Sequence, residues 1–395
     1  MSTNSLKIGL FGFGVVGEGI YQVLDQKTQL GVEVKKVVIR DPGKPRNAPA
    51  NLFTTDKNEV LDDGDIELVV ELIDDADAAY EIVRSALLLG KSVISANKKM
   101  IAKHHKELID ISTEKGVSLL YEGAVCGSVP IIRNLEEYFD NDLLTQVQGI
   151  VNGSTNYILS QMFINEQPYI EALRQAQSKG FAERDPSLDV EGFDAVYKLQ
   201  IICLHAFGKH VEASQVLRKG ITGLHPFDFQ YAREKSWIIK LIARCDTDEE
   251  SRLSRLSVLP TFVEQNNALG LTENEYNGVL IGSTLADEQF FHGKGAGRYP
   301  TSSAVLSDIS AYRYGYKYEF KKGLSQAQIS GVQSPQVYVG FDVTTPIDDS
   351  VFDEVKESFK GSERGYVIGT VNENNLRKTG WLENDKVSVI AVHLN

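Results

Sequence analysis

The chain is poor in cysteine, and its three cysteines, Cys126, Cys203 and Cys245, are widely separated among 395 residues. So small and scattered a set argues against a disulfide framework and a cysteine-rich metal site. No apolar run reaches the roughly 18 residues that a membrane-spanning helix needs. The N-terminus enters an apolar strand at once, without a signal-peptide pattern. We therefore expect a cytoplasmic protein that does not cross a membrane.

Basic charge is also scarce, since 41 lysines and arginines face 54 aspartates and glutamates, for a net charge of −13. This balance argues against nucleic acid or an anionic membrane as a partner. It says little about a small-molecule site, whose local field can differ from the average. Internal repeats and low-complexity tracts are absent as well. The length and the 42% hydrophobic content instead predict two or three globular domains.

Apolar strands alternate with amphipathic helical segments over the first part of the chain. The helical segments at 15–26, 77–90 and 100–116 separate apolar runs, and the last two end in glycine. Such alternation predicts an α/β fold with a parallel, doubly wound sheet. From about residue 150 longer helices are expected at 155–163, 169–180 and 193–208, followed by short strands and helices in a second sheet at roughly 215–290.

Gly12, Gly14 and Gly17 form a GxGxxG turn between the first expected strand and helix. Such glycines permit a tight turn, a close backbone approach to a pyrophosphate and close helix–strand packing, while the helix N-terminus offers free N–H groups. The sequence therefore predicts a dinucleotide site that also includes Phe13, Val15 and Val16. A purely structural glycine turn is the alternative.

The second expected strand ends at Arg40 and Asp41. An acidic residue there would bind a ribose diol, whereas an arginine would accept a 2′-phosphate. Because Arg40 comes first, we expect NADP to be preferred and NAD to be tolerated. Arg40 could instead pair with Asp41 or Glu33 on the surface.

An acidic stretch from Gly180 leads into the helix that contains Asp194 and Lys198. Residues four apart lie on one face of a helix, so these two side chains can point at the same neighbour. A lysine among carboxylates can bind a substrate ammonium group and exchange a proton. The alternative is a solvated acidic loop followed by a surface ion pair.

Six sequence blocks occur together in a fixed order, over about residues 5 to 320. They are GLFGFGVVG, SANKKMIA, YEGAVCGSVPII, GIVNGSTNYIL, KGFAERDPSLDVEGFDAVYKL and GKGAGRYPTSSAVLSDI. With these blocks the chain resembles the homoserine dehydrogenases, which interconvert L-aspartate 4-semialdehyde and L-homoserine with NAD(P)H. The resemblance implies a Rossmann-type nucleotide domain, a second α+β catalytic domain, and a role in the biosynthesis of threonine, methionine and isoleucine.

The resemblance also implies roles for individual residues. Lys198 would donate a proton to the substrate carbonyl, and Lys98 would lie between nicotinamide and substrate and assist proton movement. A surface lysine is the alternative for Lys98. The implied substrate-binding acids are Glu183, Asp194 and Asp189, and Gly180 and Gly297 would approach the cofactor. Asp185 and Glu191 are expected to face water or cap the helix.

In this family a monovalent cation, usually Na⁺, is bound by backbone carbonyls of the loop at 121–130. By position its ligands would be Glu122, Val125, Gly127 and Val129. Cys126 is expected to be a buried, inert thiol rather than a reactive one. The neighbouring His104 and His105 are expected to be an exposed surface pair rather than metal ligands.

The expected domains are a nucleotide domain at 1–135, completed by about 296–322, a catalytic and dimerisation domain at 136–295, and a small C-terminal module at 330–395. Many family members end in an ACT domain, a βαββαβ module that binds an effector. Here a linker at 330–336 precedes a strand, a helix at 350–359 and two strands, which indicates a shortened ACT-like module. Its alternative role is packing in a homodimer or homotetramer through an exposed sheet edge.

The leading function is that of a homoserine dehydrogenase without a fused kinase, acting on a small amino-acid substrate. Two alternatives remain. One is an oxidoreductase of another amino-acid semialdehyde. The other is a sensor that binds cofactor and amino acid without turnover, although such a sensor would not need both Lys98 and Lys198.

Overall fold

The computed structural model describes residues 5–140, 143–248, 250, 252–330, 333–345 and 347–392. The chain forms two compact units. Unit 1 comprises Met1–Glu137 and Lys294–Lys321, and unit 2 comprises Tyr138–Gly293 and Lys322–Asn395. The division into three domains stays a prediction.

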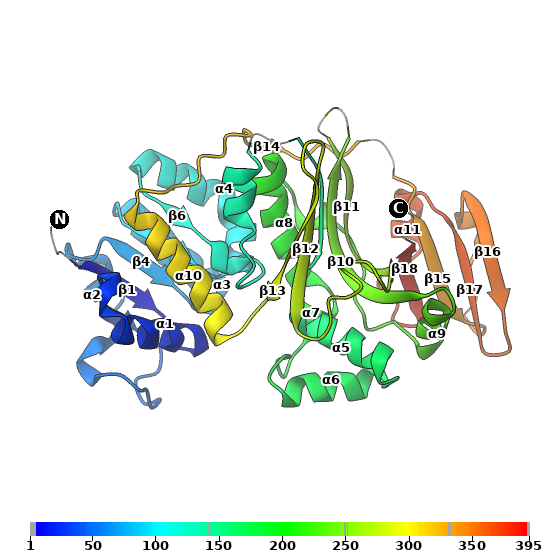
Figure 1. Ribbon diagram of the computed structural model, residues 1–395, viewed down its shortest axis with the longest axis horizontal. Coiled ribbons are helices and arrows are strands. Elements are labelled where there is room, and N and C mark those ends of the chain that lie inside the picture. The colour runs from blue at the N-terminus through cyan, green and yellow to red at the C-terminus, as the bar shows by residue number, and fades with distance from the viewer. Residues whose placement is uncertain are drawn as a thin grey trace. The chain divides into compact units, whose positions relative to one another are not determined.

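Unit 1 is built on a six-stranded parallel sheet with the order β3-β2-β1-β4-β5-β6 (Figure 1). The central strands β4 and β5 are buried along their whole length, which explains their continuous apolar runs. The expected doubly wound α/β sheet is thereby confirmed, and its carboxyl edge is where such folds bind ligands. The strands are β1 (Leu6–Phe11), β2 (Val32–Val38), β3 (Phe53–Thr54), β4 (Leu68–Glu71), β5 (Ser92–Ser95) and β6 (Leu119–Leu120).

A helix from late in the chain completes unit 1. In Figure 1 the yellow α10 (Arg298–Arg313) lies beside the blue α1 (Val15–Gln26). Arg298 forms an ion pair of 2.9 Å with Glu18 on α1, and the Ser302 hydroxyl donates to the carbonyl of Val16. The other helices of this unit are α2 (Asn58–Leu61), α3 (Ala76–Leu88) and α4 (Lys98–Lys115).

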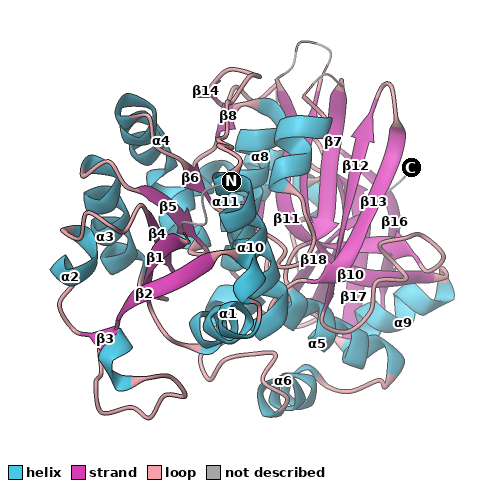
Figure 2. Cartoon of the chain, turned by 60° about the vertical axis from the view of Figure 1, so that its left-hand side comes forward, coloured by secondary structure: helices cyan, strands magenta, loops and turns pink. Residues whose placement is uncertain are grey.

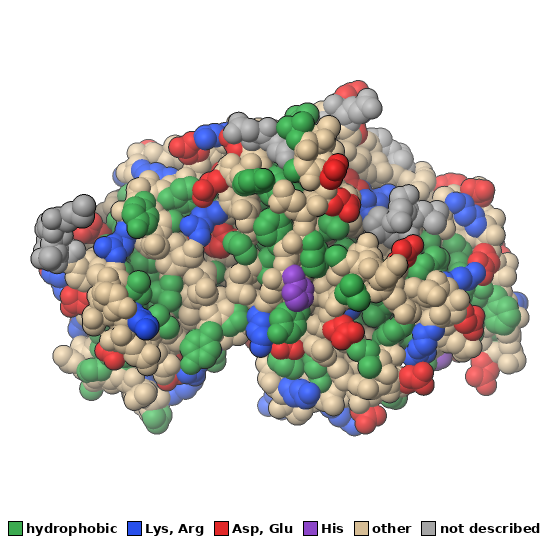
Figure 3. Space-filling model, viewed as in Figure 1, with side chains coloured by type: hydrophobic (Ala, Val, Ile, Leu, Met, Phe, Trp, Pro, Cys, Tyr) green, Lys and Arg blue, Asp and Glu red, His purple; other side chains and the backbone are tan. Residues whose placement is uncertain are grey.

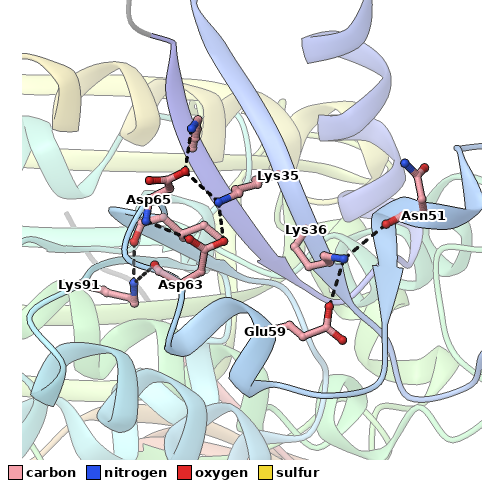
Figure 4. Close-up of polar contacts among 9 residues, drawn as sticks. Lys35, Lys36, Asn51, Glu59, Asp63, Asp65 and Lys91 are labelled. Atoms are coloured by element: carbon pink, nitrogen blue, oxygen red, sulfur yellow. Dashed lines mark hydrogen bonds and ion pairs between the residues drawn. The ribbon is translucent and has the colours of Figure 1, made fainter.

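A network of charged side chains ties together the amino ends of the unit 1 strands (Figure 4). Lys35 on β2 lies 2.6 Å from Asp63 and 3.1 Å from Asp65, in the turn before β4. Lys7 on β1 also reaches Asp65, and the buried Lys91 donates to the carbonyl of Asp63. These contacts lie at the end of the sheet opposite to its carboxyl edge, so they support the fold rather than a ligand site.

Unit 2 contains a second, larger sheet with the order β13-β12-β7-β10-β11-β18-β15-β17-β16. Its centre is the antiparallel pair of β10 and β11, whose register runs from Trp237↔Glu264 to Thr247↔Leu253. Outside the C-terminal part, the strands of this sheet are β7 (Leu144–Ile150), β9 (Leu217–Arg218), β10 (Trp237–Thr247), β11 (Leu253–Glu264), β12 (Tyr276–Ser283) and β13 (Asp287–Lys294). Two short strands, β8 (Lys209–His210) and β14 (Ser325–Gln326), form a separate sheet.

The prediction of short strands at 215–290 is wrong for β10 and β11, which span 11 and 12 residues. Charged residues inside β10 interrupt its apolar pattern, so its sequence resembles that of shorter strands. The structure gives these residues partners within one continuous strand instead. Lys240, for example, is fully buried and donates to the Asn156 side chain and to the carbonyl of Thr272.

The expected helices at 155–163, 169–180 and 193–208 are confirmed as α5 (Gly153–Ile164), α6 (Tyr169–Ser178) and α8 (Phe193–Phe207). Helix α8 packs on the sheet against β7, β10 and β11, and α5 packs against β10 and β12 (Figure 2). Nearly all of α8 is buried, which explains its apolar sequence. The unit also contains α7 (Ser187–Val190), α9 (Pro226–Glu234) and α11 (Glu373–Lys378).

The C-terminal segment continues the unit 2 sheet, and an ACT-like βαββαβ module is not confirmed. Strand β18 pairs with β11 and β15, so it joins the segment to the main sheet. The remaining order is three strands, one short helix and a last strand. The strands are β15 (Gln336–Asp342), β16 (Glu354–Lys360), β17 (Arg364–Thr370) and β18 (Val387–Val392).

The helix expected at 350–359 is wrong, because residues 354–360 form the edge strand β16. The spacing of Val355 and Phe359 mimics a helical stripe, but pairing with β17 overrides local propensity. Of the expected linker at 330–336, residues 331 and 332 lie outside the described residues. The carbonyls of Gln333 and Pro335 accept from the backbone around β17 and α11, so this part is anchored rather than free.

Within the described ranges, no helix is both long and apolar enough to cross a membrane. On the face shown in Figure 3, acidic and basic side chains are interspersed rather than gathered by sign.

Candidate active site

The glycine turn of unit 1 leaves a helix N-terminus open. Gly12 has φ +99° and donates its N–H to the carbonyl of Val38. A Cβ at Gly17 would lie 2.4 Å from the carbonyl oxygen of Gly12, so only glycine allows this packing. Gly14 caps α1 without a side-chain hydrogen bond, and the space beside its Cα is empty. The turn therefore fits a dinucleotide pyrophosphate, which binds exposed N–H groups at a helix start.

The other predicted residues of the turn differ in exposure. Phe13 is buried and packs on Tyr21 and Phe53, whereas Val15 is exposed and Val16 is half-buried. Phe13 thus anchors the turn through its side chain, and it leaves the backbone of the turn to face a ligand.

Basic residues gather near the same turn. Arg40 is exposed two residues after β2. An open pocket is lined by Phe13 to Val15, Glu18 and the loop from Lys44 to Asn47. In that loop Arg46 donates to the carbonyl of Asp41, and its buried Nε has no partner among the described residues. Sequence reasoning missed Lys44 and Arg46, although the basic residues after the second strand were visible.

Lys98 is the first residue of α4 and follows the N-cap residue of that helix, Asn97, shortly after β5 ends at Ser95. The Asn97 amide donates to the carbonyl of Ile73, and its oxygen caps the N–H of Met100. The turn is thereby fastened to the end of β4. Lys98 is half-buried at the carboxyl edge of the unit 1 sheet.

Next to the turn that precedes Lys98, a buried carboxyl group joins the ends of β4 and β5. Glu71 is 0% exposed, accepts the N–H of Ile73 at 2.7 Å and the Ser95 hydroxyl at 2.6 Å. Ser95 in turn accepts the N–H of Asn97. Burial raises the pKa of Glu71 to about 7. Sequence reasoning missed this residue, because a single acid at a strand end has no motif.

The loop at 121–130 is held by the buried carboxylate of Glu122, which accepts the N–H groups of Ile131, Ile132 and Arg133. Its backbone N–H donates to the buried Asp308 on α10. A Cβ at Gly127 would lie 2.5 Å from the carbonyl oxygen of Gly295, so this contact also requires glycine.

Of the four predicted cation ligands, the carbonyl of Glu122 accepts the N–H of Val125. The carbonyls of Val125, Gly127 and Val129 accept no hydrogen bond from a described residue. Carbonyl oxygens of this kind suit a hard cation, and the cation site at this loop stays a prediction. No group of three or more His, Cys, Asp or Glu residues that could hold a metal occurs in the described part of the chain.

Unit 2 brings Asp189, Asp194 and Lys198 together around the end of β7. The Nζ of Lys198 lies 2.7 Å from Oδ2 of Asp194 and donates to the carbonyl of Val151 at 2.6 Å. Lys198 and Asp194 are 7% and 3% exposed and Asp189 is half-buried, so the pair of Lys198 and Asp194 is buried and is not a surface ion pair. Gly192, at φ +85°, allows the sharp turn from α7 into α8 that places the two aspartates side by side.

Asn152 joins the two aspartates. Its Nδ2 donates to Oδ1 of Asp189 at 2.7 Å and to Oδ2 of Asp194 at 2.8 Å. Burial, followed by the charge of Asp194, raises the pKa of Asp189. Asn152 is not among the site residues predicted from the sequence. The signal was an asparagine between a strand and a helix, where it serves as an N-cap.

Glu183 is not brought into this cluster. Its side chain is exposed, and its carbonyl accepts from Gln177. Gly180 is also exposed, at φ +77° with open space around its Cα. Asp185 faces water as expected and accepts from Ser187, while Glu191 is exposed.

In unit 1, Gly297 caps α10 at φ +115° with its Cα side open, apart from a distant Pro300.

Cys126 is buried, as expected of an inert thiol. The expectation of exposed histidines is wrong. His104 and His105 are half-buried, because His104 stacks on Tyr80 at 3.9 Å between ring centroids.

Family models of known proteins match both the part of the chain with the glycine turn and the part with the cluster of Asp189, Asp194 and Lys198. The family model described as "Homoserine dehydrogenase, NAD binding domain" matches residues 12–122, and the one described as "Homoserine dehydrogenase" matches residues 130–310. The homoserine dehydrogenase of Bacillus subtilis is 35% identical over 316 residues, 78% of this chain and 72% of that protein. That of Synechocystis is 37% identical over 314 residues, 77% of this chain and 72% of that protein.

Solved structures show the same relationship. A homoserine dehydrogenase from Thiobacillus denitrificans has a TM-score of 0.84 at 27% identity, covering 98% of both chains. A hyperthermophilic archaeal homoserine dehydrogenase in complex with NADPH has a TM-score of 0.68 at 25% identity, covering 80% of this chain and 99% of that one. The chain belongs to the homoserine dehydrogenase family of NAD(P)-dependent oxidoreductases, enzymes of amino-acid biosynthesis that act on a small-molecule substrate.

Proposed function

We propose that unit 2 binds L-homoserine and L-aspartate 4-semialdehyde through Asp189, Asp194 and Lys198, and that Lys198 is the proton donor. The observation that carries this proposal is the charge of the buried cluster. Two carboxylates beside one ammonium leave one negative charge in excess. Such a site favours a ligand with one ammonium group, which both substrates carry.

The donors of Lys198 support its role in proton transfer. An ammonium group has three N–H donors, and within the described residues Lys198 uses two, toward Asp194 and Val151. The third is available for a substrate oxygen. As a carbonyl is reduced, negative charge develops on its oxygen, and transfer of the lysine proton there completes the alcohol. In the reverse direction the neutral lysine accepts the proton of homoserine.

When bound, NAD(P)H supplies the hydride that is added to the aldehyde carbon. The N–H groups at the open start of α1 would hold its pyrophosphate, with Gly12 to Gly17 shaping the turn. Arg40 would attract a 2′-phosphate, which makes NADP the preferred cofactor with NAD tolerated. We assign Lys98 to the nicotinamide end, where it assists proton movement, and Gly180 and Gly297 to backbone contacts with the cofactor.

Four further assignments belong to the same proposal. Glu183 would contact the substrate amino-acid group once a ligand is bound. The carbonyls of Glu122, Val125, Gly127 and Val129 would hold Na⁺, which stiffens the loop. The protein would act in the cytoplasm, because buried free cysteines suit a reducing compartment. It would form a homodimer or homotetramer, since the edge strand β16 exposes Val355 and Phe359.

The proposed function is tested by steady-state oxidation with NADP⁺, comparing L-homoserine with 4-hydroxybutyrate, which lacks the ammonium group. We expect turnover with homoserine and a kcat/KM lower by at least about 100-fold for 4-hydroxybutyrate, as for a lost buried ion pair. Equal use of both compounds would contradict the assigned site. Turnover only with longer amino-acid alcohols would favour another semialdehyde oxidoreductase. Cofactor binding without any turnover would favour a sensor.

A further inference from the structure

The two carboxylates of the unit 2 cluster come from different helices, α7 and α8, and meet at a single amide. We propose that Asn152 is a positioning residue that holds Asp189 and Asp194 together as the binding site for the substrate ammonium group. This inference rests on the proposed function and extends it to a residue that does not itself need to touch the substrate.

The orientation of the amide is fixed by the helix that it caps. The Oδ1 of Asn152 accepts the backbone N–H of Thr155 at 2.8 Å and its hydroxyl at 3.0 Å. A flipped amide would lose the bond from the Thr155 N–H and would turn its oxygen toward two carboxylates, so Nδ2 must face the aspartates. Because the two N–H bonds of a planar amide diverge at a fixed angle, they hold the two carboxylate oxygens at a fixed separation.

The neutrality of the amide is as important as its geometry. Asp189 and Asp194 are close enough to repel, and that repulsion contributes to the raised pKa of Asp189. A cationic residue at position 152 would relieve the repulsion but would cancel the negative charge that attracts an ammonium group. An amide donates to both carboxylates and leaves the excess charge in place.

The chain segment that carries Asn152 also holds the lysine. Val151, the preceding residue, accepts the Lys198 bond through its carbonyl. Both residues lie between the end of β7 and the start of α5, and Asn152 is 5% exposed. One short segment of backbone therefore sets the positions of the proton donor and of the ammonium-binding site relative to each other.

Two variants separate the capping of α5 by Asn152 from its hydrogen bonds to the two aspartates. Asn152→Ser keeps an oxygen that caps α5 well but removes both donors to the aspartates. Asn152→Ala removes the cap as well. The matched control is Asn372→Ser, which alters the N-cap of α11, where Asn372 accepts the N–H of Asn374.

For Asn152→Ser we expect the KM for homoserine to rise about tenfold or more, with the KM for NADP⁺ unchanged and kcat reduced less. Without the Nδ2 donor Asp189 protonates more readily, so the homoserine KM begins to rise at a higher pH than in the wild type. Asn372→Ser should match the wild type in each of these measurements.

The proposal is overturned by a homoserine KM and pH profile for Asn152→Ser that match the wild type. It is also overturned if Asn152→Ser impairs both substrates equally and lowers the melting temperature as much as Asn152→Ala, which is the result of a purely structural role. A wild type that does not turn over homoserine overturns the proposed function, and this inference with it. The wild-type assay therefore separates the two failures.

Discussion

At the scale of the residue, the charges of Asp189, Asp194 and Lys198 decide which molecules the unit 2 cluster can accept. Lys198 balances Asp194, while burial and repulsion by Asp194 raise the pKa of Asp189. Binding of an ammonium group would relieve this imbalance. The site is thus poised for a cation when empty, which is the reverse of a structural ion pair that is already neutral.

Replacement of Asp189 by asparagine tests this charge directly. Asp189→Asn should raise the homoserine KM about tenfold or more at pH 7 and leave the KM for NADP⁺ unchanged. The raised pKa of Asp189 means that wild-type homoserine binding should weaken, as pH falls, at a higher pH than for an ordinary aspartate. Steady-state kinetics between pH 5 and 8 measure both effects, and an unchanged homoserine KM would remove Asp189 from the site.

Glu71 predicts a pH dependence of stability in unit 1. Burial raises its pKa from the ordinary value of 4.5 to about 7 in the folded protein. As pH rises between these values the unfolded chain loses a proton that the folded chain keeps, so the free energy of unfolding falls and then levels off above pH 7. The full effect is about 3 kcal/mol.

Glu71→Gln removes this titration while it keeps the shape of the side chain. The variant should therefore gain stability relative to the wild type when the pH is raised from 5 to 8. Thermal or urea unfolding of both proteins at the two pH values provides the measurement. A difference in stability that does not change with pH would show that Glu71 is ionised in the folded protein.

At the scale of the element, two glycines at the start of α1 are needed for different reasons. Gly17 is required for packing, because its Cβ would meet the Gly12 carbonyl, whereas Gly14 borders only empty space and has φ −84°. Gly17→Ala should lower the melting temperature, at about 1–3 kcal/mol of overpacking. Gly14→Ala should fold normally but bind NADPH about tenfold or more weakly, since its methyl group occupies the expected pyrophosphate space.

Fluorescence titration with NADPH and thermal unfolding distinguish these outcomes. Wild-type NADPH affinity in Gly14→Ala would place the pyrophosphate elsewhere. Wild-type stability in Gly17→Ala would show that the α1–β1 contact can relax.

The C-terminal strands are fastened to the rest of unit 2 by a buried lysine that follows β9. Lys219 is 2% exposed and donates to the carbonyls of Trp381 and Asn384, both at 2.9 Å, in the segment before β18. Lys219→Met should destabilise this connection by about 1–3 kcal/mol for each carbonyl left without a donor. Lys386→Met, at an exposed lysine in the same segment, is the matched control.

Limited proteolysis between residues 379 and 386 gives the readout for this connection. We expect faster cleavage in Lys219→Met than in Lys386→Met and the wild type. Equal cleavage rates in all three proteins would mean that the β18 pairing alone holds the segment.

At the scale of the whole molecule, the sequence predicted unit 1 more fully than unit 2. The glycine turn, the apolar runs and the helical spacing of unit 1 are local signals, and its parallel sheet follows from their order. The length of β10 and the strand β16 depend on pairing with distant residues, which local spacing does not report.

The same difference applies to the candidate site. Asp194 and Lys198 are four residues apart, so their contact could be predicted from helix geometry. Asn152 reaches Asp189 and Asp194 across about 40 residues of sequence, and Glu71 meets Ser95 only because β4 and β5 are neighbours. Their roles became visible only when the sheets brought these residues together.

The proposed role of Lys198 as the proton donor can be measured in a single turnover. NADPH-loaded protein is mixed with L-aspartate 4-semialdehyde, and loss of NADPH absorbance is followed in the wild type, Lys198→Ala and the control Lys386→Met. We predict a rate about 10²–10⁴-fold lower in Lys198→Ala, with NADPH affinity unchanged and the control at the wild-type rate. A Lys198→Ala rate close to that of the wild type would contradict the account.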